Sequence, residues 1–422
     1  SRGLGDVYKR QVLGYTNAAN ASLMDASCVS GLRFDSLLPL VQEDVDKVRS
    51  KEKPQVVIVV AHTSMGKGDG LNLEKQGLDL FNSLKGVDVL VTGHDHSTKV
   101  LKTDSTVLLD CGRAGQYACL ADIKLVVRGG KVISRSLSGE VESFGSENYD
   151  TAMEEAFKSD YEKVRDFNAS HVGEVKKDLV SREFYYRQCD YMNFLHALAF
   201  SAWPVDISLS ATLLIDGKVP AGEVRYQDIR KIYPYDNKLI VLRLTGAEIL
   251  RYLEASYDAW ISTVPGPAEG THVLRIIQTK DYATGGLKWK LAKSPANFDS
   301  AAGIRYTVDV TKPYGSRVTV SGMADGSPFE MDKDYSVAIT SYRSTGSGGL
   351  MKAAGLMDAR SVEDRIIYRG PEFRTILYRY LKKHGSIDPA VVGDPNVVGS
   401  WRFVPDFAPE AIKADVELIY GK

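Results

Sequence analysis

The chain has 422 residues and an almost even charge balance, with 53 lysines and arginines against 54 aspartates and glutamates. This length allows two domains, or three, each with its own hydrophobic core. The even balance argues against binding to nucleic-acid polymers or anionic membranes, so recognition of a charged ligand must be local. The longest purely aliphatic run, Val56–Ala61, is too short to span a bilayer.

Residues 1–11 show no helical or strand periodicity and do not lead into a fold. They resemble translated sequencing-adaptor sequence, so we expect a non-native tail here and exclude it from the fold prediction. The absence of a signal peptide from this end is then uninformative about localisation.

The region after the tail alternates strand and helix patterns and then becomes hairpin-like. The expected elements, in chain order, are a strand at 12–16, a helical stripe at 34–48, a strand ending at His62, a helix at 72–84, a strand ending at Gly93, and hairpin strands at 106–109 and 118–127. This order predicts an α/β region followed by a β meander.

A helical pattern over 149–167 carries apolar residues at helical spacing between charged ones. We expect a solvent-facing connector helix here, with a domain boundary between 145 and 175. The remainder mixes helices and strands, and the capping box Thr245–Glu248 opens one helix. The predicted division is a tail at 1–11, a first domain at 12–147, a connector at 148–172 and a second domain at 173–422.

Two histidines follow directly on a predicted strand, in the segment Gly93-His94-Asp-His96. Residues i and i+2 of an extended segment point the same way, roughly 6–7 Å apart, which suits two imidazoles at metal ions roughly 3.5–4 Å apart. A second apolar strand ends in His62, and the carboxyl ends of parallel strands gather ligands at one edge of a sheet. The alternative is a pair of histidines in a surface loop. The pattern favours a metal site.

These motifs, strand-His62-x-x-x-Gly66 and strand-Gly93-His94-x-His96, resemble the last two motifs of the calcineurin-like metallophosphoesterases. The closer resemblance is to their 5′-nucleotidase and 2′,3′-cyclic phosphodiesterase branch, and it continues to the C-terminus. It implies an α/β plus α+β fold, with a partial metallophosphoesterase β-sandwich flanked by helices, a connector helix and a 5′-nucleotidase-type substrate-binding domain. It also implies two divalent ions of zinc, manganese or iron, with His62 and His94 on one and His96 on the other.

The family supplies its other ligands and its catalytic dyad from earlier motifs, an Asp-x-His and an Asn-His pair. Neither motif occurs in these 422 residues. Three imidazoles cannot complete two coordination shells. We therefore expect an N-terminally truncated chain that lacks its catalytic dyad and by itself hydrolyses nothing at a useful rate.

The C-terminal region resembles the nucleotide-binding domain of the same family. By that resemblance Phe298 and Tyr342 would stack on a base, with ordinary core positions as the alternative for both rings. Arg187 would contact the substrate, with a surface salt bridge as its alternative. Gly346 and Gly348 would let the backbone approach a ligand closely.

Substrate preference rests on one departure from the 5′-nucleotidase pattern. Where that branch has an asparagine, a glycine run and Ile-Arg, this chain reads Asp-Ile-Ser-Leu-Ser-Ala-Thr-Leu-Leu at 206–214. With the segment Tyr233–Asn237 and the tail Ser400–Phe403, this looks more like the 2′,3′-cyclic-nucleotide phosphodiesterase/3′-nucleotidase members, although turn chemistry alone could account for Tyr233–Asn237. The resemblance thus implies a hydrolase that prefers 2′,3′-cyclic nucleotides and 3′-nucleotides. The alternatives are a 5′-nucleotidase, a non-catalytic nucleotide-binding module, and a phosphoesterase acting on another ester such as a sugar phosphate.

The four cysteines show no Cys-x-x-Cys spacing. Cys111 and Cys119 could face each other across a hairpin. The preferred interpretation for all four, which include Cys28 and Cys189, is a buried free thiol.

Histidines outside the motif have no partner at useful spacing, so we expect His196 in the core or at its rim, and His171, His272 and His384 at the surface. The expected partner is a nucleotide substrate, with no nucleic-acid polymer and no membrane span, and the composition leaves the oligomeric state open. By resemblance the compartment is periplasmic or extracellular.

Overall fold

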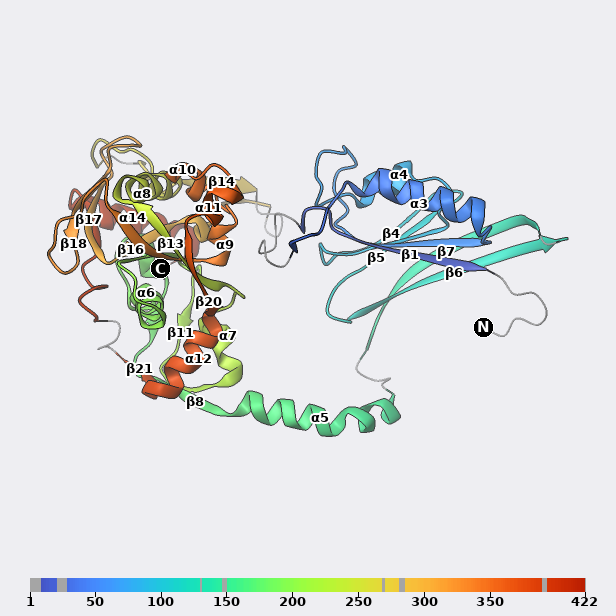
Figure 1. The fold of residues 1–422 in the computed structure, drawn as a ribbon, viewed down its shortest axis with the longest axis horizontal. Coiled ribbons are helices and arrows are strands. Elements are labelled where there is room, and N and C mark those ends of the chain that lie inside the picture. The colour runs from blue at the N-terminus through green and yellow to red at the C-terminus, as the bar shows by residue number, and fades with distance from the viewer. Residues whose placement is uncertain are drawn as a thin grey trace. The chain divides into compact units, whose positions relative to one another are not determined.

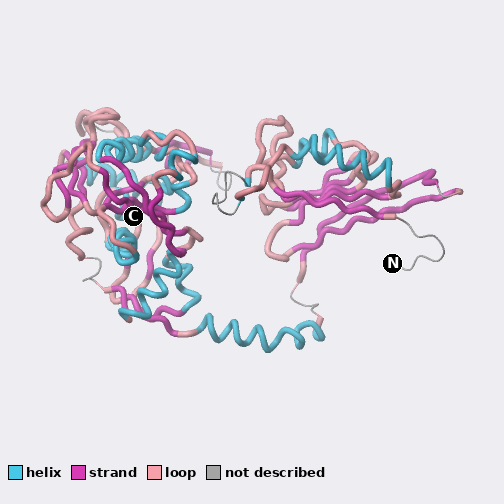
Figure 2. Tube along the Cα trace, viewed as in Figure 1, coloured by secondary structure: helices cyan, strands magenta, loops and turns pink. Residues whose placement is uncertain are grey.

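The computed structural model describes residues 9–20, 29–129, 131–145, 150–267, 270–280, 285–388 and 393–421. The chain divides into two compact units, Ser1–Ala156 and Phe157–Lys422, and the division falls within helix α5, Thr151–Ala169. Each unit is described by itself below, with many of its elements labelled in Figure 1 and all of the described elements coloured by type in Figure 2.

Unit 1 is built on a five-stranded sheet with the strand order β1-β2-β3-β5-β4. Four of its strands run parallel, and β4 is antiparallel to β5. The strands are β1 Arg10–Thr16, β2 Val56–His62, β3 Val89–Thr92, β4 Thr98–Lys102 and β5 Val107–Cys111. Runs of valine with isoleucine or leucine fill β2 and β3, as expected for strands buried on both faces.

Both faces of this sheet are covered, as Figure 1 shows. Helices α3, Leu37–Lys51, and α4, Gly77–Ser83, pack on one face around a core that includes Val41, Leu80 and Leu90. A hairpin of β6, Tyr117–Arg128, and β7, Lys131–Ser143, packs on the other face. A Cβ atom on Gly139 of β7 would lie 2.7 Å from a methyl group of Leu109, so glycine permits this close approach. The layers confirm the predicted partial β-sandwich flanked by helices.

The first strand begins earlier than predicted. Arg10 and Gln11 pair with Val56 and Val57, so the expected tail at 1–11 overlaps β1 by these two residues. Lys9 precedes the strand, and residues 1–8 of the expected tail lie outside the described residues.

Unit 2 is built on a mixed five-stranded sheet with the order β16-β10-β19-β13-β20. Strands β10 and β19 are parallel, and the other pairs are antiparallel. The strands are β10 Ile207–Ala211, β13 Lys238–Thr245, β16 Asp299–Ala302, β19 Asp334–Thr340 and β20 Ile366–Glu372.

Helices surround this sheet and bury a large aromatic core. They are α6 Asp190–Ala202, α7 Ile229–Ile232, α8 Gly246–Trp260, α9 Ser341–Ser344, α10 Leu350–Ala354, α11 Ala359–Glu363, α12 Phe373–His384 and α14 Phe407–Tyr420, with 3-10 turns η1 Arg182–Tyr185, η2 Tyr226–Asp228 and η3 Pro295–Asn297. The predicted capping box is present, because the Thr245 hydroxyl accepts from the Glu248 N–H at 3.2 Å and Glu248 accepts from the Thr245 N–H at 2.8 Å. It fixes the start of α8, which buries Tyr257 and Trp260.

Smaller sheets complete unit 2, in the orders β12-β8-β21, β18-β17-β22, β11-β9 and β14-β15. Their strands are β8 His171–Val175, β9 Leu179–Val180, β11 Lys218–Val219, β12 Gly222–Arg225, β14 Ile276–Lys280, β15 Leu287–Leu291, β17 Ile304–Asp309, β18 Val318–Met323, β21 Ser386–Ile387 and β22 Trp401–Val404.

Helix α5 has no buried residue along its whole length. Its apolar residues at helical spacing, among them Met153, Phe157 and Tyr161, are exposed. None of the described helices combines the length and the apolar character that crossing a membrane requires.

Candidate active site

Two of the three motif histidines meet at one edge of the unit 1 sheet. His62 is the last residue of β2, His94 lies just beyond β3, and these neighbouring strands are parallel. The Nδ1 atom of His94 lies 3.2 Å from Nε2 of His62, with the ring centroids 5.0 Å apart. The other ring nitrogen of His94 lies 3.0 Å from an oxygen of Glu74. A neutral His94 that donates to Glu74 carries its proton on Nε2, which leaves a lone pair on Nδ1 facing His62.

The loop that carries His94 has an unusual backbone. His94 and His96 have φ angles of 92° and 56°, in a region that residues with a side chain seldom occupy. Asp95 between them ties the loop down, because its carboxylate accepts from the Met65 N–H at 3.3 Å and from the Ser97 hydroxyl at 3.2 Å. Backbone strain of this kind persists where surrounding contacts hold it in place.

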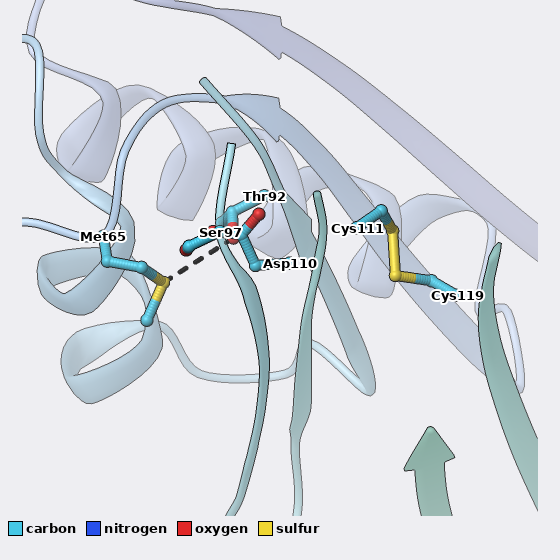
Figure 3. Close-up of a disulfide and its surroundings, with 6 residues drawn as sticks. All are labelled: Met65, Thr92, Ser97, Asp110, Cys111 and Cys119. Carbon is cyan, nitrogen blue, oxygen red and sulfur yellow. Dashed lines mark hydrogen bonds between the residues drawn. A yellow bond between two sulfur atoms is a disulfide. The ribbon is translucent and has the colours of Figure 1, made fainter. Parts of the chain in front are cut away.

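A second carboxyl group, that of Asp110 in β5, is fully buried and lies next to Ser97 (Figure 3). The Ser97 hydroxyl, which also donates to Asp95, lies 3.2 Å from an oxygen of Asp110. Burial and the neighbouring Asp95 carboxyl together raise the pKa of Asp110 to about 6. The pKa of Asp95 is lowered. Burial alone would raise it, but hydrogen bonds with Asp110 and the Met65 N–H outweigh that effect. The Ser97 hydroxyl, within reach of both carboxyls, joins the histidine loop to β5.

A disulfide joins the next residue of β5, Cys111, to Cys119 in β6, with the Cα atoms 5.6 Å apart (Figure 3). This corrects the expectation of free thiols for both, because the hairpin packs across β5 and brings the two side chains together. Cys189 is a buried free thiol as predicted, and Cys28 lies outside the described residues.

The paired imidazoles fit a metal ion. Two ligands of a tetrahedral ion with bonds of about 2.0–2.1 Å lie about 3.3 Å apart, close to the separation between the His94 and His62 nitrogens. His96 is exposed on the same loop. Across the described ranges, no group of three or more histidine, cysteine, aspartate or glutamate side chains is arranged to hold a metal. The structure thus brings His62 and His94 together and leaves His96 apart from them.

Unit 2 contains a pocket of about 250 Å³ next to the carboxyl ends of β10 and β19. Strand β19 ends at Thr340, whose side chain caps α9, and α9 carries Tyr342 and Arg343. Tyr235, on the connection between α7 and β13, also lines the pocket. The two tyrosines are 49% and 44% exposed, for Tyr235 and Tyr342, so their rings are open to a ligand. The lining residues are Leu209, Ser210, Ala211, Leu213, Tyr235, Asn237, Ala296, Asp299, Thr340, Tyr342 and Arg343.

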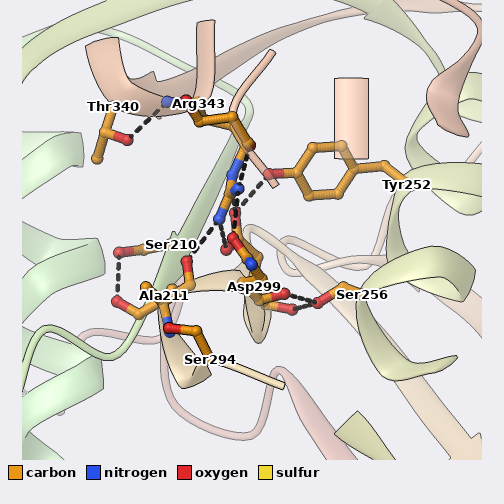
Figure 4. Close-up of polar contacts among 11 residues, drawn as sticks. Ser210, Ala211, Tyr252, Ser256, Ser294, Asp299, Thr340 and Arg343 are labelled. Carbon is orange, nitrogen blue, oxygen red and sulfur yellow. Dashed lines mark hydrogen bonds and ion pairs between the residues drawn. The ribbon is translucent and has the colours of Figure 1, made fainter. Parts of the chain in front are cut away.

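Arg343 and Asp299 form a buried ion pair at this pocket (Figure 4). The guanidinium donates to both Asp299 oxygens, from Nε at 3.1 Å and from Nη2 at 2.5 Å. It also donates to the carbonyls of Ala296 at 2.8 Å and Ser347 at 2.6 Å. Tyr252 donates its hydroxyl hydrogen to the same carboxylate. The arginine is therefore held by the protein itself and fixes the pocket floor.

Phe298 does not line the pocket. Its ring is 0% exposed and stacks on Trp260, with the centroids 5.4 Å apart and the planes 7° apart. A ring without an exposed face cannot sandwich a base, so the structure corrects the expected stacking role and gives the core alternative. Tyr235 lies in the segment Tyr233–Asn237, noted above for its family-like pattern but without a predicted base-binding role.

The other expected substrate contacts lie elsewhere. The side chain of Arg187 is 60% exposed and forms an ion pair with Glu183 at 2.5 Å. This is the surface salt bridge given above as the alternative to substrate contact. A Cβ atom on Gly348 would lie 2.2 Å from Oδ1 of Asn297 and 2.4 Å from the Arg343 guanidinium, so this glycine allows the loop to approach Arg343. Gly346 has a φ of 86° and open space around it.

Two of the remaining histidines, His196 and His272, make contacts inside unit 2. His196 is buried in α6, with its ring nitrogens 3.0 Å from the Ser208 hydroxyl and 3.2 Å from the Ser300 hydroxyl, and burial lowers its pKa to about 3. His272 is only partly exposed and lies 2.6 Å from Asp415, which corrects its expected surface position.

Comparisons with known proteins agree with this architecture. Residues 171–355 match the family model for the 5′-nucleotidase C-terminal domain. The chain is 21% identical over 413 residues to the trifunctional nucleotide phosphoesterase YfkN of Bacillus subtilis, an alignment covering 85% of this chain but 26% of that protein. It is 21% identical over 474 residues to the 2′,3′-cyclic-nucleotide 2′-phosphodiesterase/3′-nucleotidase of Salmonella typhimurium, covering 97% of this chain and 68% of that protein.

Among solved structures, a Staphylococcus aureus protein described as a 5′-nucleotidase superposes with a TM-score of 0.63 at 16% identity, over 93% of this chain and 72% of that one. This likeness shows a shared fold. The family match thus identifies residues 171–355 as a 5′-nucleotidase C-terminal domain, and the relatives that align with most of this chain are nucleotide phosphoesterases.

Proposed function

We propose that this protein hydrolyses phosphoester bonds of nucleotides at a dinuclear metal site and prefers 2′,3′-cyclic nucleotides and 3′-nucleotides. The observation that carries the proposal is the His62–His94 pair, two facing imidazole nitrogens 3.2 Å apart at the carboxyl edge of a parallel sheet. The names of the relatives support the reaction class.

His62 and His94 would hold one ion, and His96 would belong to the second. Bound zinc, manganese or iron would supply a hydroxide nucleophile and neutralise charge on the phosphoryl oxygens. The residues of this chain orient the ligands: Glu74 fixes the His94 tautomer, and the Asp95–Asp110 pair holds the loop. Three imidazoles are too few for two coordination shells, so we expect no turnover above background from the 422-residue chain alone with Mn²⁺ or Zn²⁺.

The nucleobase would bind between Tyr235 and Tyr342, the two exposed rings of the unit 2 pocket. Stacking accepts any base, because every base has a π-face. The segment at 206–214, which departs from the 5′-nucleotidase pattern, contributes Leu209, Ser210 and Ala211 to the pocket wall. Among the described residues that line the pocket, Arg343 is the only arginine, and its guanidinium group is already paired with the Asp299 carboxylate. A 5′-nucleotide would therefore lack the charged anchor that an arginine in this segment would give.

A periplasmic or extracellular location is also part of the proposal. Its support is the Cys111–Cys119 disulfide, because such bonds form and persist in oxidising compartments.

The metal site is tested by titrating the metal-free chain with Zn²⁺ and Mn²⁺ in a calorimeter. Wild type is expected to bind at least one ion, and His62→Ala and His94→Ala are expected to lose it. His171→Ala, which removes an exposed histidine of unit 2, is the matched control and should bind as wild type. Equal binding by His94→Ala and wild type would remove the basis of the proposal. Nucleotide binding without any metal binding would favour the alternative of a non-catalytic binding module.

Substrate preference is tested by affinity in EDTA, where nothing is hydrolysed. We expect 2′,3′-cyclic AMP and 3′-AMP to bind more tightly than 5′-AMP. In a longer form of the protein that supplies an Asp-x-His and an Asn-His motif, kcat/KM should follow the same order. Tighter binding of 5′-AMP would move the protein to the 5′-nucleotidase alternative.

A further inference from the structure

A second cavity in unit 2, of about 480 Å³, lies where the last turn of α5, the η2–α7 segment and the first turn of α12 meet. Its lining residues are distinct from those of the pocket lined by Tyr235 and Tyr342. The volume is within the range of small-molecule sites, which runs from about 300 to 1,000 Å³.

One wall of this cavity is aromatic. The rings of Phe167 and Tyr226 lie 4.3 Å apart, and Tyr378 meets Tyr226 edge-on at 5.6 Å. Phe167 is half exposed, so its ring can be covered by a planar ligand. The amide side chains of Asn168 and Gln227 also line the cavity and offer both donors and acceptors.

Two arginines line the same cavity. Arg230 is exposed and forms no hydrogen bond or ion pair within the described ranges, whereas Arg374 is mostly buried and each of its three guanidinium nitrogens has a protein acceptor. Burial lowers the pKa of Arg374, and the nearby charge of Arg230 lowers it further. Glu372 is the one carboxylate among the described lining residues, and Arg374 is also paired with Asp236, so Arg230 is the arginine open to an added anion. An anion between the arginines would relieve their repulsion.

We propose that this cavity binds a nucleoside monophosphate, with the base against Phe167 and Tyr226 and the phosphate between Arg230 and Arg374. An aromatic wall with amide groups beside it recognises a base, and paired guanidinium groups recognise a phosphate. The site is separate from the proposed substrate pocket, and its existence does not depend on hydrolysis.

Arg374 connects the two sites. Its Nε donates to the Tyr233 carbonyl at 3.0 Å, and its other nitrogens bind the Pro234 carbonyl and the Asp236 carboxylate. These contacts flank Tyr235, the ring that faces the first pocket. A phosphate bound to Arg374 competes with Asp236 and loosens the segment that presents Tyr235. Ligand in the second cavity therefore weakens binding in the first, and the effect is reciprocal.

The test is calorimetric titration of the whole chain with 3′-AMP in EDTA. Wild type is expected to bind two equivalents. Arg230→Met should lose one site or weaken it at least tenfold, and Tyr342→Ala should weaken the other. Arg379→Met, which removes an exposed arginine from α12 outside this cavity, is the matched control and should keep both sites. A single site in wild type, or two unchanged sites in Arg230→Met, would overturn the inference.

The same experiment separates this inference from the proposed function. An unchanged titration for Tyr342→Ala together with a loss for Arg230→Met would refute the proposed base pocket and leave the second site standing.

In the Tyr342→Ala background, adenosine is expected to bind at least tenfold more weakly than 3′-AMP, because it has no phosphate for the arginines. In that background 3′-AMP should also speed amide hydrogen exchange in Tyr235–Asn237. Equal affinity for adenosine would contradict the phosphate contact, and unchanged exchange would contradict the coupling.

Discussion

Tyr342 and Phe298 show how exposure separates binding from packing. Removal of the Tyr342 ring takes away a face that a base can cover, whereas removal of the Phe298 ring opens a cavity beside Trp260. We expect Tyr342→Ala to weaken 3′-AMP binding about tenfold, near 1.4 kcal/mol, with little change in stability. Phe298→Ala should instead cost about 3–5 kcal/mol of unfolding free energy. Titration and urea denaturation of both variants measure these effects.

An outcome in which Phe298→Ala stays stable and loses nucleotide affinity would restore the stacking role that the resemblance implied. That role was assigned from position in a motif, and motif position does not reveal exposure. The proximity of His62 and His94 was easier to predict, because a histidine at a strand end leaves the sheet at the edge where the neighbouring parallel strand also ends. The approach of His62 to His94 depends on the turn around Asp95, which sequence spacing alone does not determine.

His196 should make stability depend on pH. Its folded pKa of about 3 lies below the ordinary value of about 6.5, so between these values the unfolded chain binds a proton that the folded chain does not. This contribution to stability is complete above about pH 6.5 and falls by up to about 1.4 kcal/mol per pH unit as the pH drops. We expect the unfolding free energy from urea denaturation to fall more steeply from pH 7 to pH 5 in wild type than in His196→Gln. Parallel curves would contradict this reading.

The segment between α7 and β13 shows how one helix positions another element. The first turn of α12 holds it through Arg374 and through Phe373, whose ring stacks on Tyr233 at 5.0 Å. Lysine keeps the charge of Arg374 but cannot bind three acceptors at once. In an Arg230→Met background, which leaves the first pocket to be measured alone, Arg374→Lys should weaken 3′-AMP binding by about tenfold.

The control for this prediction is Arg379→Lys in the same background, since it makes the same exchange on the same helix. Amide exchange in Tyr235–Asn237 should rise in Arg374→Lys and stay unchanged in the control. Loss of affinity with unchanged exchange would mean that Arg374 acts on the ligand directly and not by positioning Tyr235.

Elements with strong local patterns were predicted well. The apolar runs of β2 and β3 and the capping box of α8 each carry their own signal. The sequence favoured free thiols over the Cys111–Cys119 disulfide. The bond depends on how the β6–β7 hairpin packs across β5, and the sequence of a single segment does not determine such a contact between elements.

At the scale of the whole molecule, the two units bury separate hydrophobic cores. We expect two calorimetric unfolding transitions, one for each unit. The Cys111–Cys119 disulfide closes a short loop, with a sequence separation of 8, so its removal should cost unit 1 about 2–3 kcal/mol. Cys111→Ser/Cys119→Ser should lower one transition and leave the other in place. A single transition, or an equal shift of both, would contradict independent cores.

The buried ion pair beneath the unit 2 pocket also bears on how such a protein can diverge. Because Arg343 and Asp299 satisfy each other and the surrounding carbonyls, the floor keeps its shape whether or not a ligand is present. Variation is then cheapest at the rim, at positions such as Ser210 and Leu213. A search for variants with a new nucleotide preference should therefore randomise the rim and keep the floor unchanged. A change at Arg343 would leave the buried Asp299 carboxylate without its ion-pair partner and destabilise the fold.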